Sequence, residues 1–390
     1  MNLTSPPPPM SPRLRRYPSA VVMQPGTFCN LDCRYCYLPA RRTRRRMSVP
    51  VAEAVAATVN AWAARRDGFE VFWHAGEPLA VGRAHLAALL APFRGVTHVV
   101  QSNATLIDDA WCAFFDGHGV RVGVSVDGPV AMGDDRHTPA GRSAFGRILD
   151  GIACLRRNAV PFSVLAVVAD PDPGLAGRFY EFFVELGPTA LGVSIEQRVG
   201  AHTAAPQHDP ARVSDFWAAL AQAWADNPAI RVREIDRDLR TVRRVLAGDS
   251  RPNAGAVDPL PTITTDGDVV LIAPELAGFQ DRRFGDFGSG NVLADALGVI
   301  LAEAPQRTWW LADHLDAVRT CLTTCRYAGF CDGPSPAADY FEHGHFHEGA
   351  TSHCRTTVIA RADAICRPIL AHAAQSLAIS RSGGVTRDCR

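Results

Sequence analysis

The stretch Ala20-Val-Val-Met-Gln-Pro-Gly-Thr-Phe-Cys29-Asn-Leu-Asp-Cys33-Arg-Tyr-Cys36 joins a short apolar run to three closely spaced cysteines. The apolar run predicts a buried strand over residues 20–24, and the polar residues that follow predict a loop. Cysteines separated by three and by two residues can converge from one loop onto a single metal centre. The stretch therefore predicts a strand that ends in a metal-binding loop.

An alternation of apolar strands and longer helical segments continues after this loop. Six strand–helix units indicate parallel strands joined by right-handed crossovers, which is an α/β fold. Six units are fewer than a closed eight-stranded barrel needs, so we expect an open, partial (β/α)6 barrel with its site at the carboxyl ends of the strands. The further strands are expected at 70–74, 97–102, 121–126, 162–168 and 190–195, and the helices at 49–64, 82–92, 108–117, 141–158, 175–186 and from about 209.

The alternation of strands and helices ends near residue 230, which predicts a change of domain. Residues 19–230 are assigned to the barrel, 1–18 to a flexible Pro-rich arm, and 379–390 to a flexible tail. Residues 231–378 are expected to form a smaller Cys-rich domain. It would contain a helix over 235–247, a hairpin turning at Asp266-Gly267 with strands 261–265 and 268–272, and a final helix over 356–378.

Composition excludes several kinds of chemistry. All 40 basic residues are Arg, and they balance 40 acidic residues. Without Lys there is no Schiff-base lysine and no Walker A lysine. The zero net charge disfavours nucleic acid as a partner. No stretch approaches the roughly 20 apolar residues that cross a membrane, and no signal peptide is recognisable, so we expect a cytoplasmic protein. In that reducing compartment clustered cysteines favour metal binding.

The three-cysteine loop, with Tyr35 before its last cysteine, resembles that of the radical S-adenosylmethionine (AdoMet) enzymes. The resemblance implies a [4Fe-4S] cluster held by Cys29, Cys33 and Cys36, with its open iron chelated by AdoMet. One electron would then cleave AdoMet to a deoxyadenosyl radical, which abstracts a hydrogen from the substrate. Such chemistry belongs to the cofactor and needs no catalytic lysine.

Motifs at the other strand ends extend the resemblance. His74-Ala-Gly-Glu-Pro78 looks like the family's Gly-Gly-Glu-Pro element, which contacts the methionine amino group; here Ala75 replaces the first glycine. Ser125 matches a cofactor-binding serine of the peptide-modifying branch, and Arg136 is placed to bind the methionine carboxylate. The cofactor contacts implied in this way are Tyr35, Gly76, Glu77, Pro78, Ser102, Asn103, Ser125, Arg136 and Glu196.

Three of these assignments leave an alternative open. For Ser102, Asn103 and Glu196 a purely structural role is the alternative to cofactor binding. Glu196 and Asp266 are also the candidates for a residue near the substrate. No other catalytic residue is assigned.

A second cysteine group follows the barrel at Cys321, Cys325, Cys331 and Cys354. Four thiolates can close an iron–sulfur cluster, and they can equally hold a structural zinc. The arrangement resembles the SPASM extension of peptide-modifying radical enzymes, although the first spacing here is three residues where that family has two. The hairpin carries no cysteine for a further auxiliary cluster. We therefore expect two [4Fe-4S] clusters, one catalytic and one auxiliary.

Four cysteines remain, and none shows the spacing of a partner. Cys112 and Cys154 lie on apolar helical faces, which indicates core positions. Cys366 falls in the last helix and Cys389 in the tail. These four are expected to take no part in metal binding.

The resemblance implies a radical SAM oxidoreductase that modifies a ribosomally made precursor peptide, supplied with electrons by a flavodoxin or ferredoxin. The specific hypothesis is a maturase that forms a side-chain crosslink, a cyclophane-type C–C bond. The alternatives are a formylglycine-generating sulfatase maturase and a peptide epimerase or thioether-forming enzyme. A non-catalytic metal-binding protein would explain the cysteines but not Glu77, Ser125 and Arg136.

Overall fold

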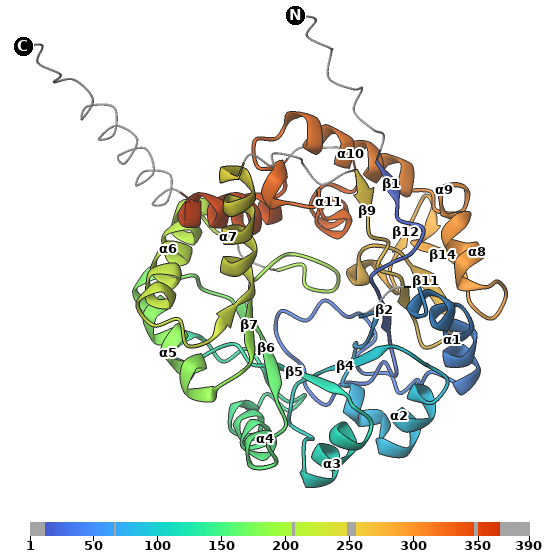
Figure 1. Ribbon diagram of the computed structural model, residues 1–390, viewed down its shortest axis with the longest axis horizontal. Coiled ribbons are helices and arrows are strands. Elements are labelled where there is room, and N and C mark those ends of the chain that lie inside the picture. The colour runs from blue at the N-terminus through green and yellow to red at the C-terminus, as the bar shows by residue number, and fades with distance from the viewer. Residues whose placement is uncertain (1–11, 66–67, 205–206, 248–254, 347–349, 367–390) are drawn as a thin grey trace, which may run out of the picture.

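The computed structural model describes residues 12–65, 68–204, 207–247, 255–346 and 350–366. Its centre is a run of six parallel strands that lie side by side in chain order. The strands are β2 (Ala20–Met23), β3 (Glu70–Trp73), β4 (Thr97–Ser102), β5 (Arg121–Ser125), β6 (Phe162–Val168) and β7 (Ala190–Ile195). The helices after them are α1 (Val49–Ala63), α2 (Arg83–Leu90), α3 (Asp109–Gly117), α4 (Phe145–Arg157), α5 (Ala176–Leu186) and α6 (Pro210–Asp226). The helices form an outer layer around the curved sheet (Figure 1), so the expected partial barrel is confirmed.

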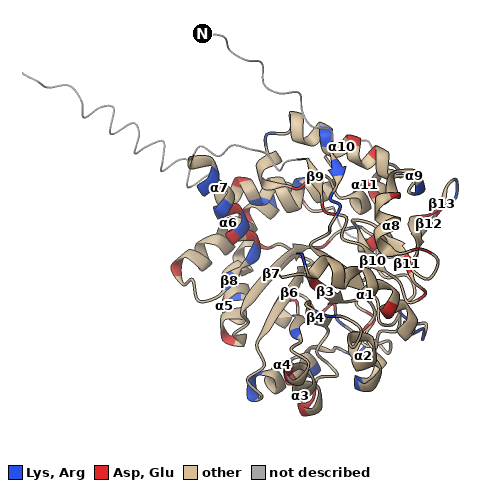
Figure 2. Ribbon diagram, turned by 45° about the vertical axis from the view of Figure 1, so that its right-hand side comes forward, with Lys and Arg blue, Asp and Glu red and all other residues tan. Residues whose placement is uncertain are grey.

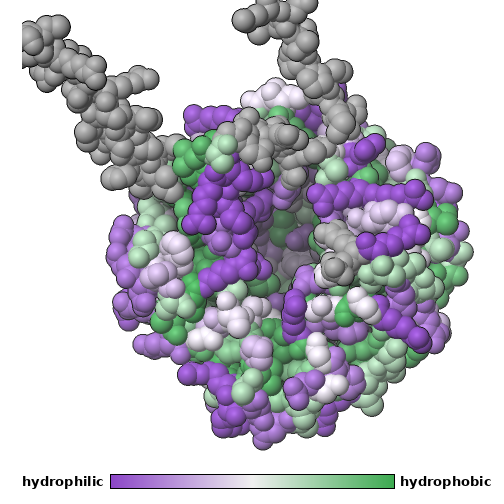
Figure 3. Space-filling model, viewed as in Figure 1, coloured by the Kyte–Doolittle hydropathy of each residue, from purple (hydrophilic) through white to green (hydrophobic). Residues whose placement is uncertain are grey.

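The interior of this barrel is only partly filled. Residues of β4 and β6 alternate between fully buried and half-buried along each strand. The period of two means that one set of side chains packs under the helices and the other faces the barrel interior. The space-filling view shows a central hollow at this place (Figure 3). An open barrel of this kind leaves room at its mouth for a cofactor and a substrate.

The sheet continues beyond the six expected strands. Strand β8 (Arg231–Val232) is parallel to β7, and β10 (Thr262–Ile263) is parallel to β2. Strand β10 forms the predicted hairpin with β11 (Asp268–Val270), in which Gly267 adopts a φ of +92° that a glycine tolerates. Strand β14 (Gly288–Asn291) pairs antiparallel with β11 and completes a ten-stranded sheet. The hairpin therefore extends the barrel sheet next to the strand that carries the cysteine loop.

The N-terminal segment is more ordered than its composition suggests. Strand β1 (Arg13–Leu14) pairs in parallel with β9 (Ala256–Val257), whereas we expected a flexible arm through residue 18. A pairing across more than two hundred residues leaves no local pattern, which explains the difference. Residues 1–11, the tail 379–390 with Cys389, and the part of the last predicted helix beyond 366 lie outside the described residues.

The C-terminal half carries its own aromatic core beside the barrel. The Trp310 and Phe346 rings stack at 5.3 Å, and the Phe287 and Tyr340 rings meet edge to face at 4.7 Å. The helices here are α7 (Arg233–Leu246), α8 (Leu297–Ala302), α9 (Ala304–Arg307), α10 (Leu311–Thr324), α11 (Pro336–His343) and a π-helical turn (Cys354–Ile359), and a small hairpin joins β12 (Gln280–Asp281) to β13 (Gly285–Asp286). Short 3-10 turns are η1 (Pro78–Val81), η2 (Val130–Met132), η3 (Pro173–Leu175), η4 (Pro274–Leu276) and η5 (Ala328–Phe330).

A buried ion pair ties the end of the described chain to this half. The Arg361 guanidinium donates to both carboxylate oxygens of Asp238 on α7, at 2.8 and 3.1 Å. Both side chains are almost fully buried. No helix in the described part of the chain combines the length and apolar character needed to cross a bilayer.

Candidate radical site and second cysteine cavity

The cysteine loop follows β2 and is fixed by backbone hydrogen bonds from both sides. The Cys29 N–H donates to the Arg41 carbonyl at 2.8 Å, and the Asp32 N–H donates to the His137 carbonyl at 2.7 Å. Burial raises the pKa of the Cys29 thiol to about 12 and that of the Cys33 thiol to about 11. These thiols are therefore neutral until a cation displaces their protons.

The segment after β3 packs directly on the cysteine loop. The Glu77 N–H donates to the Phe28 carbonyl at 2.8 Å. A Cβ at Gly76 would lie only 2.5 Å from that same carbonyl oxygen, so glycine is required for this close approach. Ala75 has a φ of +84°, a strained conformation for alanine, which explains why glycine suits that position in the related element.

The Glu77 carboxylate organises the ends of two strands. It is buried and accepts hydrogen bonds from the Ser102 hydroxyl at 2.8 Å, the Asn103 N–H at 2.8 Å and the Leu79 N–H at 3.1 Å. Burial raises its pKa, although these three donors oppose that effect. The Asn103 side-chain amide in turn lies 3.8 Å from the Cys29 sulfur. Glu77, Ser102 and Asn103 thus form one network against the cysteine loop.

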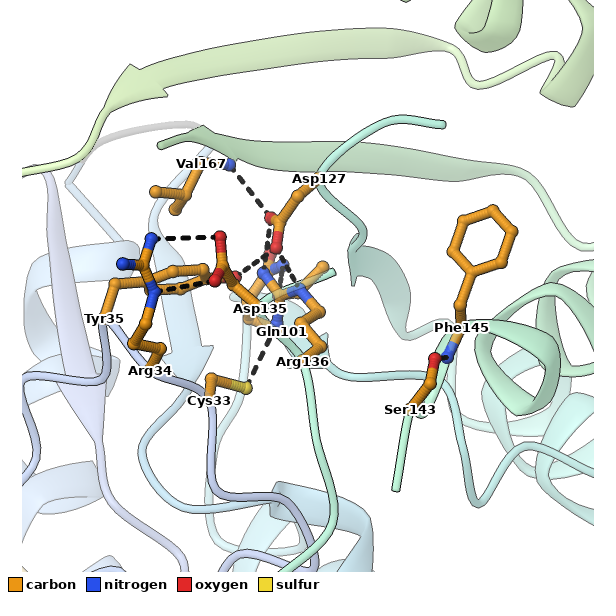
Figure 4. A network of polar contacts seen from close by, with 11 residues as sticks. Cys33, Arg34, Tyr35, Gln101, Asp127, Asp135, Arg136, Ser143, Phe145 and Val167 are labelled. Carbon is orange, nitrogen blue, oxygen red and sulfur yellow. Dashed lines mark hydrogen bonds and ion pairs between the residues drawn. The ribbon is translucent and has the colours of Figure 1, made fainter. Parts of the chain in front are cut away.

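A second network connects β5 to the same loop (Figure 4). Arg136 donates to both oxygens of Asp127, from Nε at 2.9 Å and Nη2 at 3.0 Å, while its Nη1 lies 4.0 Å from the Cys33 sulfur. Asp127 also accepts from the Tyr35 hydroxyl at 2.5 Å and from the Val167 N–H at 3.0 Å. Asp127 therefore braces Arg136 through Nε and Nη2, so that Nη1 faces the cysteine loop.

The remaining predicted residues lie at neighbouring strand ends. The Gln101 side-chain amide donates to the Ser125 hydroxyl at 2.8 Å. Glu196, which follows β7, has a fully buried side chain that contacts the His202 Nε2 at 2.8 Å and the Arg34 Nη2 at 3.5 Å. Because Arg34 belongs to the cysteine loop, Glu196 also reaches the mouth of the barrel. Pro78 begins η1, for which Glu77 is the N-terminal cap.

Comparison with known proteins assigns this barrel. The model of the radical SAM superfamily matches residues 23–173. The chain carries a radical SAM domain. It is accordingly an enzyme of that superfamily, as the cysteine loop predicts.

Relatives and solved structures extend the likeness beyond the radical SAM domain. An uncharacterised protein of Synechocystis sp. is 29% identical over 86% of this chain and 88% of its own length. The serine-type anaerobic sulfatase-maturating enzyme of Klebsiella aerogenes is 35% identical, but the match covers 45% of this chain and only 46% of that enzyme.

Two solved structures share the fold over most of the chain. The structure of anSMEcpe with bound AdoMet has a TM-score of 0.70 at 19% identity and covers 90% of this chain and 98% of its own. Streptococcus suis SuiB bound to its precursor peptide SuiA has a TM-score of 0.63 at 14% identity, with 87% and 76% covered. At these identities the structures show a common fold.

The residues at the radical SAM site fit a cluster of several irons. In the part of the chain that the structure describes, no three His, Cys, Asp or Glu side chains gather closely enough to ligate one ion. The thiols of a four-iron cluster each bind a different iron, so they need not gather so tightly. Cys29, Cys33 and Cys36 lie close enough to interact electrostatically and would hold that cluster. Arg136 Nη1 would face the cofactor carboxylate.

The four later cysteines line a single cavity of about 240 Å³. Cys321 lies on α10, Cys325 caps it, Cys331 follows η5 and Cys354 begins the π-helical turn. Burial, together with the nearby thiols of Cys331, Cys321 and Cys325, raises the pKa of Cys354 to about 12. The structure therefore brings all four predicted ligands together.

Two polar side chains that we did not predict share this cavity. Asp339 on α11 is buried with one carboxylate oxygen lacking a hydrogen bond, and His353 has an unpartnered Nδ1. Burial and the nearby Glu342 raise the pKa of Asp339 to about 7. The position of His353 beside Cys354 was visible in the sequence, whereas the approach of α11 was not.

Asp266 lies at the same edge of the sheet as the cysteine loop, because the hairpin turn follows β10, which runs parallel to β2. It sits at the hairpin turn, is more than half exposed, and pairs with Arg45 at 2.9 Å. It lines a cavity of about 460 Å³ between the hairpin and the loop after Cys36, where Leu38 and Gly76 contribute. No cysteine lines this cavity within the described ranges, in line with the absence of cysteine from the hairpin.

The contacts among three further polar groups at the mouth were not predicted from the sequence. The Tyr37 hydroxyl and His74 Nε2 are 2.9 Å apart, and burial lowers the pKa of His74 to about 4. Glu275 on η4 lies close enough to interact electrostatically with Tyr37, and burial raises its pKa. Its carboxylate accepts from its own backbone N–H and has no other partner in the described structure. A single acid in the apolar run 271–277 was the available signal.

Two of the remaining cysteines are neighbours in the core. Cys112 and Cys154 are buried as expected, but their sulfur atoms lie 3.8 Å apart between α3 and α4. The sequence does not indicate this contact, because 41 intervening residues give no recognisable spacing. The packing of two successive helices brings them together.

Proposed function

We propose that this radical SAM enzyme abstracts a hydrogen from a ribosomally made precursor peptide and forms a side-chain crosslink, with a cyclophane-type C–C bond as the specific product. The observation that carries the proposal is the convergence of Glu77, Arg136 and the cysteine loop at a barrel mouth that also holds unpartnered polar groups. When bound, the cluster and AdoMet would supply a one-electron route to hydrogen abstraction.

The protein side chains would bind and orient the reactants. Arg136, braced by Asp127, presents Nη1 to the carboxylate of AdoMet, and the Glu77 network fixes the strand ends around its amino group. Ser125 and Glu196 face the same opening from β5 and β7. The half-filled barrel gives a peptide segment access to this point, since the inward positions of β4 and β6 are not packed over.

A peptide substrate is supported by the kinds of protein that share the fold. SuiB is solved with its precursor peptide SuiA, and anSMEcpe with the peptides Cp18Cys and Kp18Cys. We propose that the Cys321/Cys325/Cys331/Cys354 cavity holds an auxiliary [4Fe-4S] cluster, with a flavodoxin or ferredoxin as electron donor. A zinc ion at four thiolates is the competing occupant.

Anaerobic reconstitution tests the assignment of the two sites. We expect about eight irons per chain, and about four after substitution of Cys325 by Ala. The triple variant Cys29→Ala/Cys33→Ala/Cys36→Ala should release no deoxyadenosine from AdoMet, whereas Cys325→Ala should retain part of this activity but lose peptide product. Normal deoxyadenosine release by the triple variant would refute the assignment.

Mass spectrometry of a co-expressed peptide tests the reaction. A peptide encoded beside the gene is the natural probe, and a crosslink should remove two hydrogens and tie two residues into one fragment. Fragmentation between those residues would then be suppressed. A mass loss confined to one residue, with free fragmentation around it, would contradict crosslinking.

Formylglycine formation on a sulfatase is the second candidate, favoured by the 35% identity to the Klebsiella aerogenes enzyme. Related enzymes use an Asp beside a ligand of a first auxiliary cluster, for which this hairpin carries no cysteine. A sulfatase-derived peptide containing the target serine or cysteine distinguishes the two candidates. Aldehyde formation on that peptide, detected by a hydrazide reagent, would favour the second.

A further inference from the structure

A second cavity lies directly against the proposed auxiliary site. It measures about 580 Å³ and its wall is strongly basic. Cys331 lines both this cavity and the cysteine cavity, so this one residue forms part of the wall between them. The basic side chains that line it are Arg15 and four residues of α7, namely Arg237, Arg240, Arg243 and Arg244.

The positive charge of this surface is only partly compensated. Arg237 pairs with Asp332 at 3.0 Å and Arg240 pairs with Asp236 at 2.8 Å. Arg244 donates to the Thr241 hydroxyl. Neither Arg243 nor Arg244 has a carboxylate partner in the described part of the structure.

The other acidic residues of α7 are used elsewhere. Asp238 is buried against Arg361, and Glu234 accepts from the Val193 N–H at 3.0 Å. The outer face of α7 is consequently basic although the whole chain has zero net charge, and Figure 2 shows its blue segments gathered at one edge of the molecule. A local excess of this kind attracts an acidic surface and speeds encounter with it.

We propose that this arginine surface of α7 is the docking site for a small acidic electron-transfer protein, which reduces the auxiliary cluster by way of Cys331. The inference rests on the proposed function, because it requires a cluster in the cysteine cavity. One electron leaves the reduced partner and one electron enters the oxidised cluster, with no bond made or broken. The short path through a residue that borders both cavities suits such a transfer.

The composition of the surface argues against nucleic acid. Its lining consists of Arg, Thr, Gly, Cys and Asp, without an aromatic side chain on which a base could stack. Asp332 also places a negative charge beside Cys331. An acidic protein can meet the exposed guanidinium groups at its rim without entering the cavity.

The test compares two charge-reversed holoenzymes, both reconstituted anaerobically. The docking variant is Arg240→Glu/Arg243→Glu/Arg244→Glu. The matched control is Arg147→Glu/Arg156→Glu/Arg178→Glu, three exposed arginines on α4 and α5. Stopped-flow absorbance follows cluster oxidation state after mixing with a reduced acidic [2Fe-2S] ferredoxin, and with the methyl viologen radical cation as a reductant that needs no docking site.

We expect the docking variant to react with ferredoxin at least tenfold more slowly at low salt, and the strong salt dependence of the wild-type rate to disappear. The control variant should keep both the wild-type rate with ferredoxin and its salt dependence. Methyl viologen should reduce all three proteins at comparable rates. An unchanged ferredoxin rate would overturn the docking site. So would an equal loss with methyl viologen, or a loss of precursor-peptide binding with ferredoxin reduction intact.

The iron content distinguishes a wrong docking site from a wrong proposed function. A wild-type chain with about four irons lacks the auxiliary cluster, and both proposals then fall. If a chain with about eight irons is reduced by ferredoxin at a rate that does not depend on the α7 arginines, only the docking site is refuted.

Discussion

The Arg136 guanidinium donates two hydrogen bonds to the Asp127 carboxylate, at 2.9 and 3.0 Å, and holds its remaining nitrogen toward Cys33. The pair is mostly buried, with 12% and 14% of the two side chains exposed. Charge-assisted bidentate bonds fix the plane of a guanidinium, so Asp127 determines where Arg136 can bind an anion.

Substitution of Asp127 by Asn should therefore weaken cofactor binding. Asparagine removes the charge and one acceptor, and we expect the AdoMet concentration for half-maximal deoxyadenosine release to rise about tenfold, equivalent to about 1.4 kcal/mol. Iron content should remain normal, because the three cysteines are untouched. The measurement is a deoxyadenosine titration with excess reductant.

Asp135 provides the matched control on the same loop. It pairs with Arg34 at 2.7 Å, but the Arg34 side chain is 56% exposed. An exposed pair contributes little, about 0–1 kcal/mol. Asp135→Asn should thus leave the titration almost unchanged, and equal effects of the two substitutions would show that Asp127 has no special positioning role.

Substitution of Gly76 by Ala should disrupt the cysteine loop. The new Cβ would meet three backbone carbonyl oxygens at 2.5 to 2.9 Å, and backbone atoms cannot move aside as a side chain can. We expect a loss of at least 3 kcal/mol of stability and incomplete reconstitution of the first cluster. Iron analysis and urea unfolding of the metal-free chain measure both effects.

Gly82 is the control for backbone strain alone. Its φ is +85°, but a Cβ there would meet nothing within 4 Å. Gly82→Ala should cost about 1–3 kcal/mol, because a φ of +85° with a ψ of 151° is unfavourable for a residue with a Cβ, and should leave the iron content normal. If Gly76→Ala behaves like Gly82→Ala, the close approach to the cysteine loop is not required.

Ala75 gives the reverse prediction. Its φ of +84° is strained for a residue with a Cβ, so Ala75→Gly should raise the free energy of unfolding by up to about 1 kcal/mol, less the greater entropy of glycine in the unfolded chain. Urea unfolding of the metal-free protein measures the change. A loss of stability would show that the surrounding contacts of the Ala75 methyl outweigh the strain.

The predictable part of this site follows from the local nature of its signals. Strands such as β4 and β6 are marked by short apolar runs, and parallel strands bring their carboxyl ends to one edge. For that reason Glu77, Ser102 and Asn103 could be expected near the cysteine loop from separate segments. The loop itself is recognisable from spacing alone.

The parts that were missed depend on contacts between distant segments. The pairing of β1 with β9, the meeting of Cys112 with Cys154, and the position of Glu275 are all set by packing. Strand β8 has only two residues, too few for a periodic pattern. The arginines of α7 were visible, but only the fold places them beside Cys331.

Stability should fall as the pH drops below neutrality because of buried histidines. The Trp73 Nε1–H donates to His98 Nδ1 at 3.1 Å, and burial, with a smaller contribution from His118, lowers the pKa of His98 to about 4. Between pH 6.5 and 4 the unfolded chain binds a proton at this residue that the folded chain does not. The free energy of unfolding therefore falls by up to about 1.4 kcal/mol per pH unit for this histidine.

His98→Leu isolates this contribution in the metal-free protein. At pH 7.5 the variant should be about 1–3 kcal/mol less stable, because the Trp73 N–H loses its acceptor. The difference in the free energy of unfolding between the wild type and the variant should narrow as the pH falls from 6.5 toward 4, since only the wild type loses stability through His98. His343→Leu, at an exposed position, serves as the control. A difference that stays constant from pH 7.5 to 5 would contradict the buried neutral histidine.

Glu275 should show opposite effects on stability and on product formation. Burial raises its pKa, so ionising it above its unfolded pKa destabilises the folded chain, and this loss persists at neutral pH. Glu275→Gln removes the charge and should raise the urea midpoint at pH 7.5 but not at pH 4.

A destabilising group retained at a barrel mouth is typical of a functional residue. If its carboxylate contacts the peptide, product formation should fall roughly tenfold, the effect of losing about 1.4 kcal/mol. Deoxyadenosine release should be unchanged, because the cysteine loop and Arg136 remain intact. A more stable variant with full product formation would make Glu275 a structural residue only, and a loss of deoxyadenosine release would place it with the cofactor instead.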